Sequence, residues 1–213
     1  MQEQPIIIPG PAGNIEAMLH IPHDTATYKQ VGIICHPHPL QGGTMSNKVV
    51  TTMQRTFREL GLPTVRFNFR GVGQSAGEYD HGKGETEDLF AVIAWAKQQF
   101  PTKTILLAGF SFGSYVAFRA AHSIENLEGL ISIAPPVTYV DFNEIPLPTS
   151  TWIIVQGDED EVIDPTAVFT WIDGLTIQPT VLHFENAGHF FHGRLVELRE
   201  RLAAAIQQQV QLT

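Results

Sequence analysis

The sequence is poor in cysteine and in basic charge. Cys35 is the only cysteine among 213 residues, so neither an internal disulfide nor a thiolate metal cluster is available, which suits a reducing compartment. Lys and Arg total 13 against 22 Asp and Glu, a net charge of −9, and the chain therefore lacks the basic surface that a polyanion needs. We expect no nucleic acid partner.

Long apolar runs are also lacking. The first residues, 1–5, are polar, and the apolar tract 6–8 ends at Pro9. A secretory leader and a membrane span both need a much longer apolar stretch. We therefore expect a cytoplasmic protein that makes no membrane contact.

Composition is that of an ordinary globular chain, with 43% hydrophobic and 16% charged residues. The length fits one domain, and no repeat or linker interrupts it. We expect a single domain over residues 1–213, as a monomer or a small homo-oligomer.

Short runs rich in Val and Ile alternate with longer amphipathic segments, a pattern typical of an α/β sheet protein. We predict strands at residues 5–8, 14–21, 31–35, 64–69, 104–108, 129–133, 151–156 and 180–184. Helices are predicted at residues 46–60, 85–100, 112–123, 165–171 and 193–210, with Ser46 and Asp164-Pro165 as helix starts. Only residues 9–13 join the first two strands, so these should pair antiparallel at one edge.

One segment carries a specific chemical signature. The apolar strand 104–108 runs into Gly109-Phe110-Ser111-Phe112-Gly113, and a helical segment follows at once. This is G-x-S-x-G in its required strand–turn–helix context, in which the turn is so sharp that its flanking positions must be nearly free of side chain. It predicts Ser111 as a nucleophile at a helix N-terminus, where developing negative charge is stabilised.

A serine nucleophile needs a base and an acid that orients the base. His189 follows Gly188 in the loop after strand 180–184, whereas His183 lies inside that strand, so His189 is the better base. The acid should come from the loop after strand 151–156. Five carboxylates crowd that loop, and the residues alone leave the choice open: Asp158, Glu159, Asp160, Glu161 and Asp164.

The oxyanion formed by acyl transfer needs two N–H donors. One should be the backbone of Phe112, after the nucleophile, and the other should come from the loop 35–44. Pro37 and Pro39 have no N–H to donate. The second donor is then the backbone of His38 or of Leu40.

Several motifs together resemble those of the α/β-hydrolase superfamily. These are HPHP at 36–39 with GGT at 42–44 and NKVV at 47–50, FNFRGVGQS at 67–75, the serine turn, and GHFF at 188–191. The sequence resembles a small lidless bacterial branch related to dienelactone hydrolases and to prolyl-oligopeptidase-like catalytic domains. The resemblance implies a mostly parallel eight-stranded sheet with helices on both faces and no lid. It also implies Asp160 as the acid, from Gly-x-x-Asp followed by an apolar pair, and His38 as the second donor.

Other patterns are weaker. Residues 71–76 match the dinucleotide motif G-x-G-x-x-A, but no helix is predicted to open there, and residues 77–83 match G-x-x-x-x-G-K with Gly84 in place of Ser or Thr. His36-x-His38 and His189-x-x-His192 lack further ligands at metal-binding spacing. We therefore predict no cofactor and no metal, and we expect the loop 70–84 to be structured, with Arg70 paired to an acid.

The predicted activity is hydrolysis of a small carboxylic ester through an acyl-enzyme. The alternatives are a small amidase or peptidase, a lactone hydrolase, or a non-catalytic scaffold that binds a ligand or partner. Residues 134–148 contain four prolines, which leaves little room for a lid helix and predicts an irregular loop. We expect Tyr139 and Phe142 at the rim of an open pocket, with Leu40 and Phe190 also lining it, and a small acyl compound as substrate.

Overall fold

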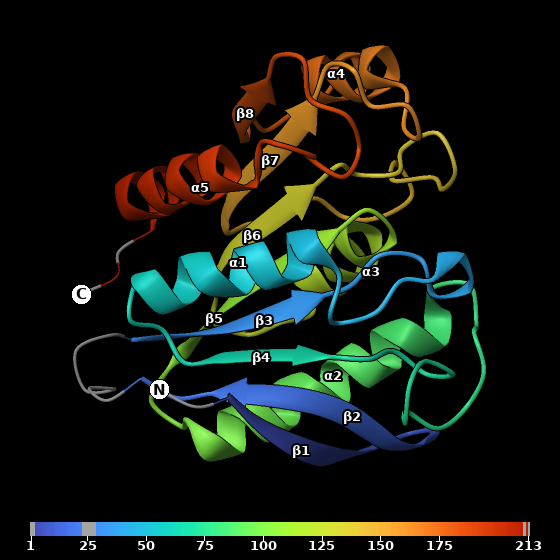
Figure 1. Ribbon diagram of the computed structural model, residues 1–213, viewed down its shortest axis with the longest axis vertical. Coiled ribbons are helices and arrows are strands. Elements are labelled where there is room, and N and C mark those ends of the chain that lie inside the picture. Colours follow the sequence, from blue (N-terminus) through green and yellow to red (C-terminus); the bar gives the residue numbers. More distant parts are fainter. Residues whose placement is uncertain (1–2, 23–28, 211, 213) are drawn as a thin grey trace.

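The protein is built on one eight-stranded sheet (Figure 1). The computed structural model describes residues 3–22, 29–210 and 212. The strands run in the order β1-β2-β4-β3-β5-β6-β7-β8. Their bounds are β1 (Glu3–Gly10), β2 (Gly13–His20), β3 (Gln30–Cys35), β4 (Thr64–Phe67), β5 (Thr104–Phe110), β6 (Leu127–Ile133), β7 (Thr151–Gly157) and β8 (Thr180–Phe184).

Six of these strands, β3 to β8, are mutually parallel. Strand β2 pairs antiparallel with both β1 and β4, so the β1–β2 hairpin forms one edge of the sheet, as predicted. Because the parallel strands point the same way, the loops that follow them meet at one edge, where the sites of open α/β sheets lie.

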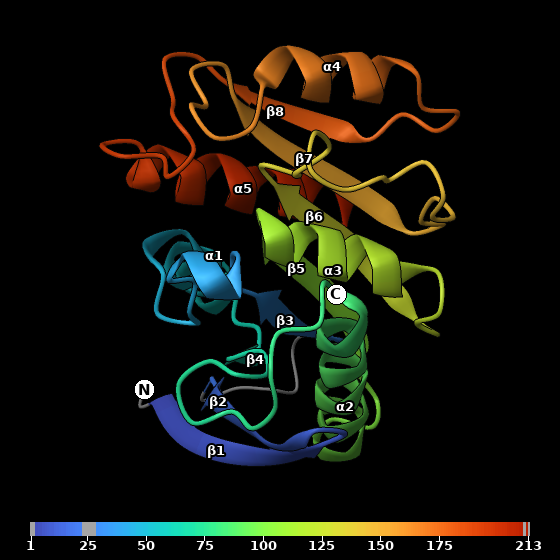
Figure 2. The ribbon, with the colours of Figure 1, turned by 90° about the vertical axis from the view of Figure 1, so that its right-hand side faces the viewer.

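Helices cover both faces of the sheet (Figure 2). Helices α1 (Lys48–Glu59) and α5 (Leu195–Gln209) lie on one face, and α2 (Lys83–Gln99), α3 (Phe112–Ala121) and α4 (Pro165–Asp173) lie on the other. Each face buries its own apolar cluster, with Met53 and Leu202 in one and Val92 and Phe118 in the other. Among the described helices, none is both long and apolar enough to cross a bilayer.

The predicted elements are all present, and the differences lie at their ends. Helix α1 begins at Lys48 and not at Ser46, because the Asn47 side chain caps it by accepting the Val49 N–H at 2.8 Å. Strand β4 stops at Phe67, two residues early, because the Phe69 N–H donates to the His36 ring at 3.0 Å. Helix α4 begins after Asp164, as predicted, and that side chain accepts the Thr166 N–H.

The segment between β6 and β7 contains neither a helix nor a strand, so the fold has no lid. Two loops near the same edge are braced by ion pairs and turns. Arg70 pairs with the buried Asp88 of α2 at 2.9 Å, as expected for a structured loop 70–84. The short 3-10 turn η1 (Pro39–Gln41) follows β3. These connections form the rim around the end of β5.

Candidate active site

Ser111 occupies the tight turn between β5 and α3. Its backbone has φ 52° and ψ −122°, a conformation that costs a non-glycine residue about 1–3 kcal/mol. The Ser111 N–H donates to the Ile133 carbonyl at 2.8 Å, and the Ser111 carbonyl accepts from the N–H and the hydroxyl of Ser114. These bonds hold the strained turn in place.

The two glycines of the turn are required by close backbone contacts. A Cβ at Gly109 would overlap the Gly113 carbonyl, and a Cβ at Gly113 would overlap the carbonyls of Cys35 and His36. Helix α3 therefore starts directly against the ends of β5 and β3. The predicted reason for small residues at both positions is confirmed.

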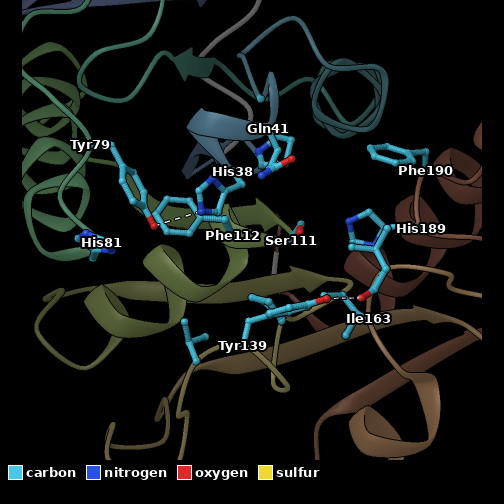
Figure 3. A pocket seen from close by; sticks show the side chains of 15 residues that line it. His38, Gln41, Tyr79, His81, Ser111, Phe112, Tyr139, Ile163, His189 and Phe190 are labelled. Carbon is cyan, nitrogen blue, oxygen red and sulfur yellow. Dashed lines mark hydrogen bonds between the residues drawn. The ribbon is translucent and has the colours of Figure 1, made fainter.

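His189 and Asp160 form a buried hydrogen-bonded pair. His189 Nδ1 lies 2.8 Å from Asp160 Oδ2, and the two residues are only 3% and 7% exposed. With Nδ1–H donated to the carboxylate, Nε2 of a neutral ring is left as an acceptor. Both Ser111 and His189 line the same pocket (Figure 3).

Asp160 is held as an ionised acceptor. Its Oδ1 accepts the backbone N–H groups of Val162 and Ile163 at 2.9 and 2.7 Å, and the Gln156 amide donates to Oδ2 at 3.2 Å. Burial pushes the pKa of Asp160 upward, but the hydrogen bonds from His189, Ile163 and Val162 outweigh it, and the net pKa is lowered. A charged Asp160 is suited to fixing the orientation of His189.

The neighbouring acids point elsewhere. Asp158 accepts the Asn186 N–H at 2.7 Å and lies 3.4 Å from His183, on the exposed side of β8. Glu161 accepts the backbone N–H of His189 at 3.0 Å. Of the candidate carboxylates, Asp160 is therefore the one that contacts the ring of His189, while Glu161 supports its backbone.

The loop after β3 leaves few backbone donors free. The Leu40 N–H donates to His38 Nδ1 at 3.2 Å, and the N–H groups of Gln41 and Gly43 donate to the His38 carbonyl. Within the described residues, the backbone N–H groups of His38 and Phe112 have no hydrogen-bond partner. Of the two open candidates for the second donor, Leu40 is already occupied.

His36 is a structural residue of this loop. Its Nδ1 donates to the Pro37 carbonyl at 2.6 Å and its Nε2 accepts the Phe69 N–H at 3.0 Å, so neither nitrogen is free for a metal. Burial lowers the pKa of His36 to about 4, although the Pro37 bond acts in the opposite direction. Among the described residues, no group of three or more His, Cys, Asp or Glu could hold a metal ion.

The pocket above Ser111 has a volume of about 720 Å³, within the usual range for small-ligand sites. It is lined by Pro37, His38, Gln41, Gly43, Tyr79, His81, Ser111, Phe112, Pro136, Tyr139, Val140, Val162, Ile163, His189 and Phe190. No carboxylate and no Lys or Arg is among these residues. The pocket is therefore aromatic and apolar with a few neutral hydrogen-bonding groups.

Comparison with known proteins places this chain in a family. Residues 13–146 match the X-Pro dipeptidyl-peptidase (S15 family) model, which covers the serine turn. The chain belongs to the S15 family. An uncharacterized protein of Rickettsia prowazekii is 32% identical over 203 residues, 91% of this chain and 84% of its own length.

Two solved structures are similar to this chain over nearly its whole length. A lidless α/β serine hydrolase from Xanthomonas campestris is 44% identical, with a TM-score of 0.94 over 100% of this chain and 97% of its own. An α/β serine hydrolase homologue from Coxiella burnetii is 47% identical, with a TM-score of 0.92 over 97% of this chain and 98% of its own. The S15 protein thus has the lidless α/β-hydrolase fold, as predicted, and is a hydrolase.

Two predictions for the pocket of this S15 protein are wrong. Phe142 does not reach the rim: it is 2% exposed and packs against Phe118 of α3 and Trp171 of α4. Leu40 does not line the pocket, because it lies on η1 and is 69% exposed to solvent. Tyr139 and Phe190 do line it, and Tyr139, 70% exposed, donates its hydroxyl to the Val162 carbonyl.

Three polar side chains of the pocket escaped the sequence analysis: Gln41, Tyr79 and His81. Tyr79 and His81 come from the loop between β4 and α2, and Gln41 comes from η1. The predicted topology could have indicated them, because loops that follow parallel strands converge at the carboxyl edge of the sheet. Cys35 ends β3, is fully buried and has a pKa raised by burial, so it is a packing residue and not a thiolate.

Proposed function

We propose that this S15 protein is a serine hydrolase that cleaves small carboxylic esters, with Ser111 as nucleophile, His189 as general base and Asp160 as the acid that orients it. The observation that carries the proposal is the buried His189–Asp160 hydrogen bond of 2.8 Å beside Ser111 in one pocket. Such a pair activates a serine hydroxyl, which is otherwise a weak nucleophile at neutral pH.

In the first half of the proposed reaction, Ser111 Oγ attacks the ester carbonyl carbon and its proton passes to His189 Nε2. The resulting imidazolium is stabilised by the ionised Asp160. The carbonyl oxygen becomes an oxyanion, which the free N–H groups of Phe112 and His38 stabilise. When the tetrahedral species collapses, the carbon–oxygen bond to the alcohol breaks, and His189 returns the proton to the leaving alkoxide.

In the second half, water replaces the alcohol. His189 Nε2 takes a proton from the water, whose oxygen attacks the carbonyl carbon of the acyl-enzyme. The second tetrahedral species collapses with cleavage of the bond to Ser111 Oγ, and His189 returns the proton to that oxygen. The products are a carboxylic acid, an alcohol and free enzyme.

The charge of the pocket favours an ester over an X-Pro dipeptide. An enzyme that removes dipeptides from a free N-terminus must bind an ammonium group, and a buried cation needs an anionic or strongly accepting partner. No carboxylate is among the residues that line this pocket. The S15 match nonetheless makes a small peptidase or amidase the second candidate, with a lactone hydrolase close behind.

Labelling with a fluorophosphonate tests the nucleophile. The wild-type protein should form a covalent adduct on Ser111, and Ser111→Ala should lose both labelling and turnover while keeping its fold. Ser123→Ala, at an exposed position after α3, serves as the matched serine control and should label normally. A folded Ser111→Ala protein that still labels would exclude Ser111, and a wild-type protein that never labels would favour a non-catalytic scaffold.

The substrate class is tested with matched leaving groups. We expect turnover of p-nitrophenyl acetate and butyrate to exceed that of Gly-Pro p-nitroanilide by orders of magnitude in kcat/KM. A preference for the dipeptide anilide would replace the ester assignment with the peptidase. Preferential opening of a small lactone would assign the third candidate.

A further inference from the structure

Tyr79 lies beside His38 and Phe112, whose backbone N–H groups have no hydrogen-bond partner among the described residues. It belongs to the loop between β4 and α2 and lines the pocket. Its hydroxyl lies 3.1 Å from His38 Nε2, the contact marked in Figure 3. Its ring centroid lies 4.9 Å from that of His38 and 5.7 Å from that of Phe112.

The three rings form one cluster, since the ring centroids of His38 and Phe112 also lie 5.1 Å apart. His38 follows β3 and Phe112 begins α3, so the two proposed oxyanion donors come from different segments. Their separation is therefore set by the packing of these segments, in which the side-chain cluster adds to the backbone contacts between β3, β5 and Gly113. Tyr79 is the member of the cluster that packs on both without supplying a donor of its own.

The protonation of His38 fixes the direction of the bond to Tyr79. His38 Nδ1 accepts the Leu40 N–H at 3.2 Å, and burial lowers the pKa of His38, which favours the neutral ring. The hydrogen of a neutral ring must then be on Nε2, which donates to the Tyr79 hydroxyl oxygen. Both ring nitrogens of His38 are held, one by its own loop and one by Tyr79.

The loop that carries Tyr79 is joined to α2 by several hydrogen bonds. The buried Glu85 accepts the N–H of Asp80 at 2.9 Å and the N–H of Gly82 at 2.7 Å. Arg70, at the start of the loop, forms a bidentate contact with Asp88. Tyr79 thus connects this hydrogen-bonded loop to the turn after β3.

We infer that Tyr79 is a positioning residue of the oxyanion hole, which sets the placement of the His38 and Phe112 N–H groups by holding their side chains. The inference rests on the proposed function. Displacing an oxyanion-hole donor by a fraction of an ångström weakens the binding of the transition state more than the binding of the substrate. Loss of the Tyr79 hydroxyl should therefore lower kcat and leave KM almost unchanged.

The test compares Tyr79→Phe with Tyr115→Phe. Tyr115 also packs on Phe112, with 6.3 Å between the ring centroids. Its hydroxyl accepts a hydrogen bond from Arg119, and it does not line the pocket. On p-nitrophenyl butyrate we expect Tyr79→Phe to lower kcat roughly 10-fold to 100-fold with KM within about twofold. Tyr115→Phe should keep wild-type kcat. Affinity for a boronic acid transition-state analogue should fall with kcat in Tyr79→Phe alone.

A second variant protects the test against misfolding. His38→Ala keeps its backbone N–H but loses the ring, so it should show the same loss of kcat, and adding Tyr79→Phe to it should have no further effect. The inference is overturned if Tyr79→Phe keeps wild-type kcat, if it raises KM alone, or if the two substitutions multiply. Labelling of wild-type Ser111 is measured in parallel, so a failure of the triad is distinguished from a failure at Tyr79.

Discussion

The pocket around Ser111 has two walls, and each wall is built in a different way. On the acid–base wall, formed by the loops after β7 and β8, side chains meet each other, as His189 and Asp160 do at 2.8 Å. On the other wall, formed by the loops after β3 and β4 and called the oxyanion wall after its proposed role, the side chains of His36, His38 and Tyr79 hold the backbone.

This difference determines how each wall responds to mutation. A substitution on the acid–base wall removes a group that acts in the proposed reaction, so its effect on rate is direct. Apart from substitution by proline, a change of side chain leaves the backbone N–H in place, so other substitutions on the oxyanion wall act through geometry and stability. The predictions below test this division.

The largest effect is expected on the acid–base wall, at Asp160. Asp160→Asn should lower kcat by about 10²–10⁴-fold, because an amide facing Nδ1 favours the wrong imidazole tautomer and carries no charge to stabilise the imidazolium. Steady-state kinetics on p-nitrophenyl acetate measure the loss. Asp158→Asn, in the same loop but paired with His183, is the control and should change kcat less than about threefold. If Asp158 proves the damaging position, the acid is wrongly assigned.

His36 should make the oxyanion wall sensitive to acid. Its pKa of about 4 lies below the value of 6.5 of an unfolded histidine, so between these values the unfolded chain binds more protons than the folded one. The stability that the neutral His36 contributes is therefore fully present above pH 6.5 and is lost as the pH falls toward 4. The loss should reach roughly 3 kcal/mol near pH 4.

Urea unfolding at pH 7 and at pH 4.5 measures this loss in the wild type and in His36→Gln, which cannot be protonated. We expect the variant to be less stable at pH 7 but to lose less stability on acidification. His20, whose pKa burial also lowers, is present in both proteins, so its contribution cancels. Equal losses in the two proteins would show that His36 is not the acid-sensitive group.

The acid–base wall was more accessible to prediction than the oxyanion wall. The serine turn is a local feature, because Gly109, Ser111 and Gly113 stand within five residues and their strand and helix flank them directly. Strand β8 begins and ends where the sequence predicted, so the loop carrying His189 could be located. Asp160 needed the family pattern, since its loop contains five carboxylates of similar local character.

Features set by packing between distant segments were missed. Nothing near Phe142 in sequence shows that Trp171, on α4, covers its ring, and nothing near Tyr79 shows that His38 is its partner, 41 residues away. The start of α1 depended on whether Ser46 or Asn47 caps it, and both are good N-caps. Sequence pattern therefore located the elements and the serine turn, but it did not determine which aromatic side chains face the pocket.

A smaller effect is expected at Glu161, which supports His189 through the backbone. Glu161→Ala removes the acceptor of the His189 N–H, a bond of 3.0 Å at a partly exposed site, and should cost about 1 kcal/mol of stability. Because the ring keeps its bond to Asp160, kcat should fall far less than in Asp160→Asn. Glu159→Ala is the matched control, and thermal melts with parallel kinetics compare the two. If Glu161→Ala were as inactive as Asp160→Asn, Glu161 would have to be added to the proposed catalytic residues.

The smallest effect concerns the open side of the pocket, between the two walls. Residues 134–150 form no lid, so the part of an acyl chain that extends beyond the pocket stays in water. Each methylene that is fully buried adds at most about 0.8 kcal/mol of binding, or about fourfold in kcat/KM. We expect kcat/KM on p-nitrophenyl esters to rise modestly from acetate to butyrate and then to fall, with no jump when the ester forms micelles. Tyr139→Ala, which removes the exposed ring at the rim, should lower kcat/KM for butyrate about twofold to threefold and leave acetate nearly unchanged, because a two-carbon acyl group does not reach the rim. An optimum at palmitate, or activation at the lipid interface, would mean that some other element covers the acyl chain.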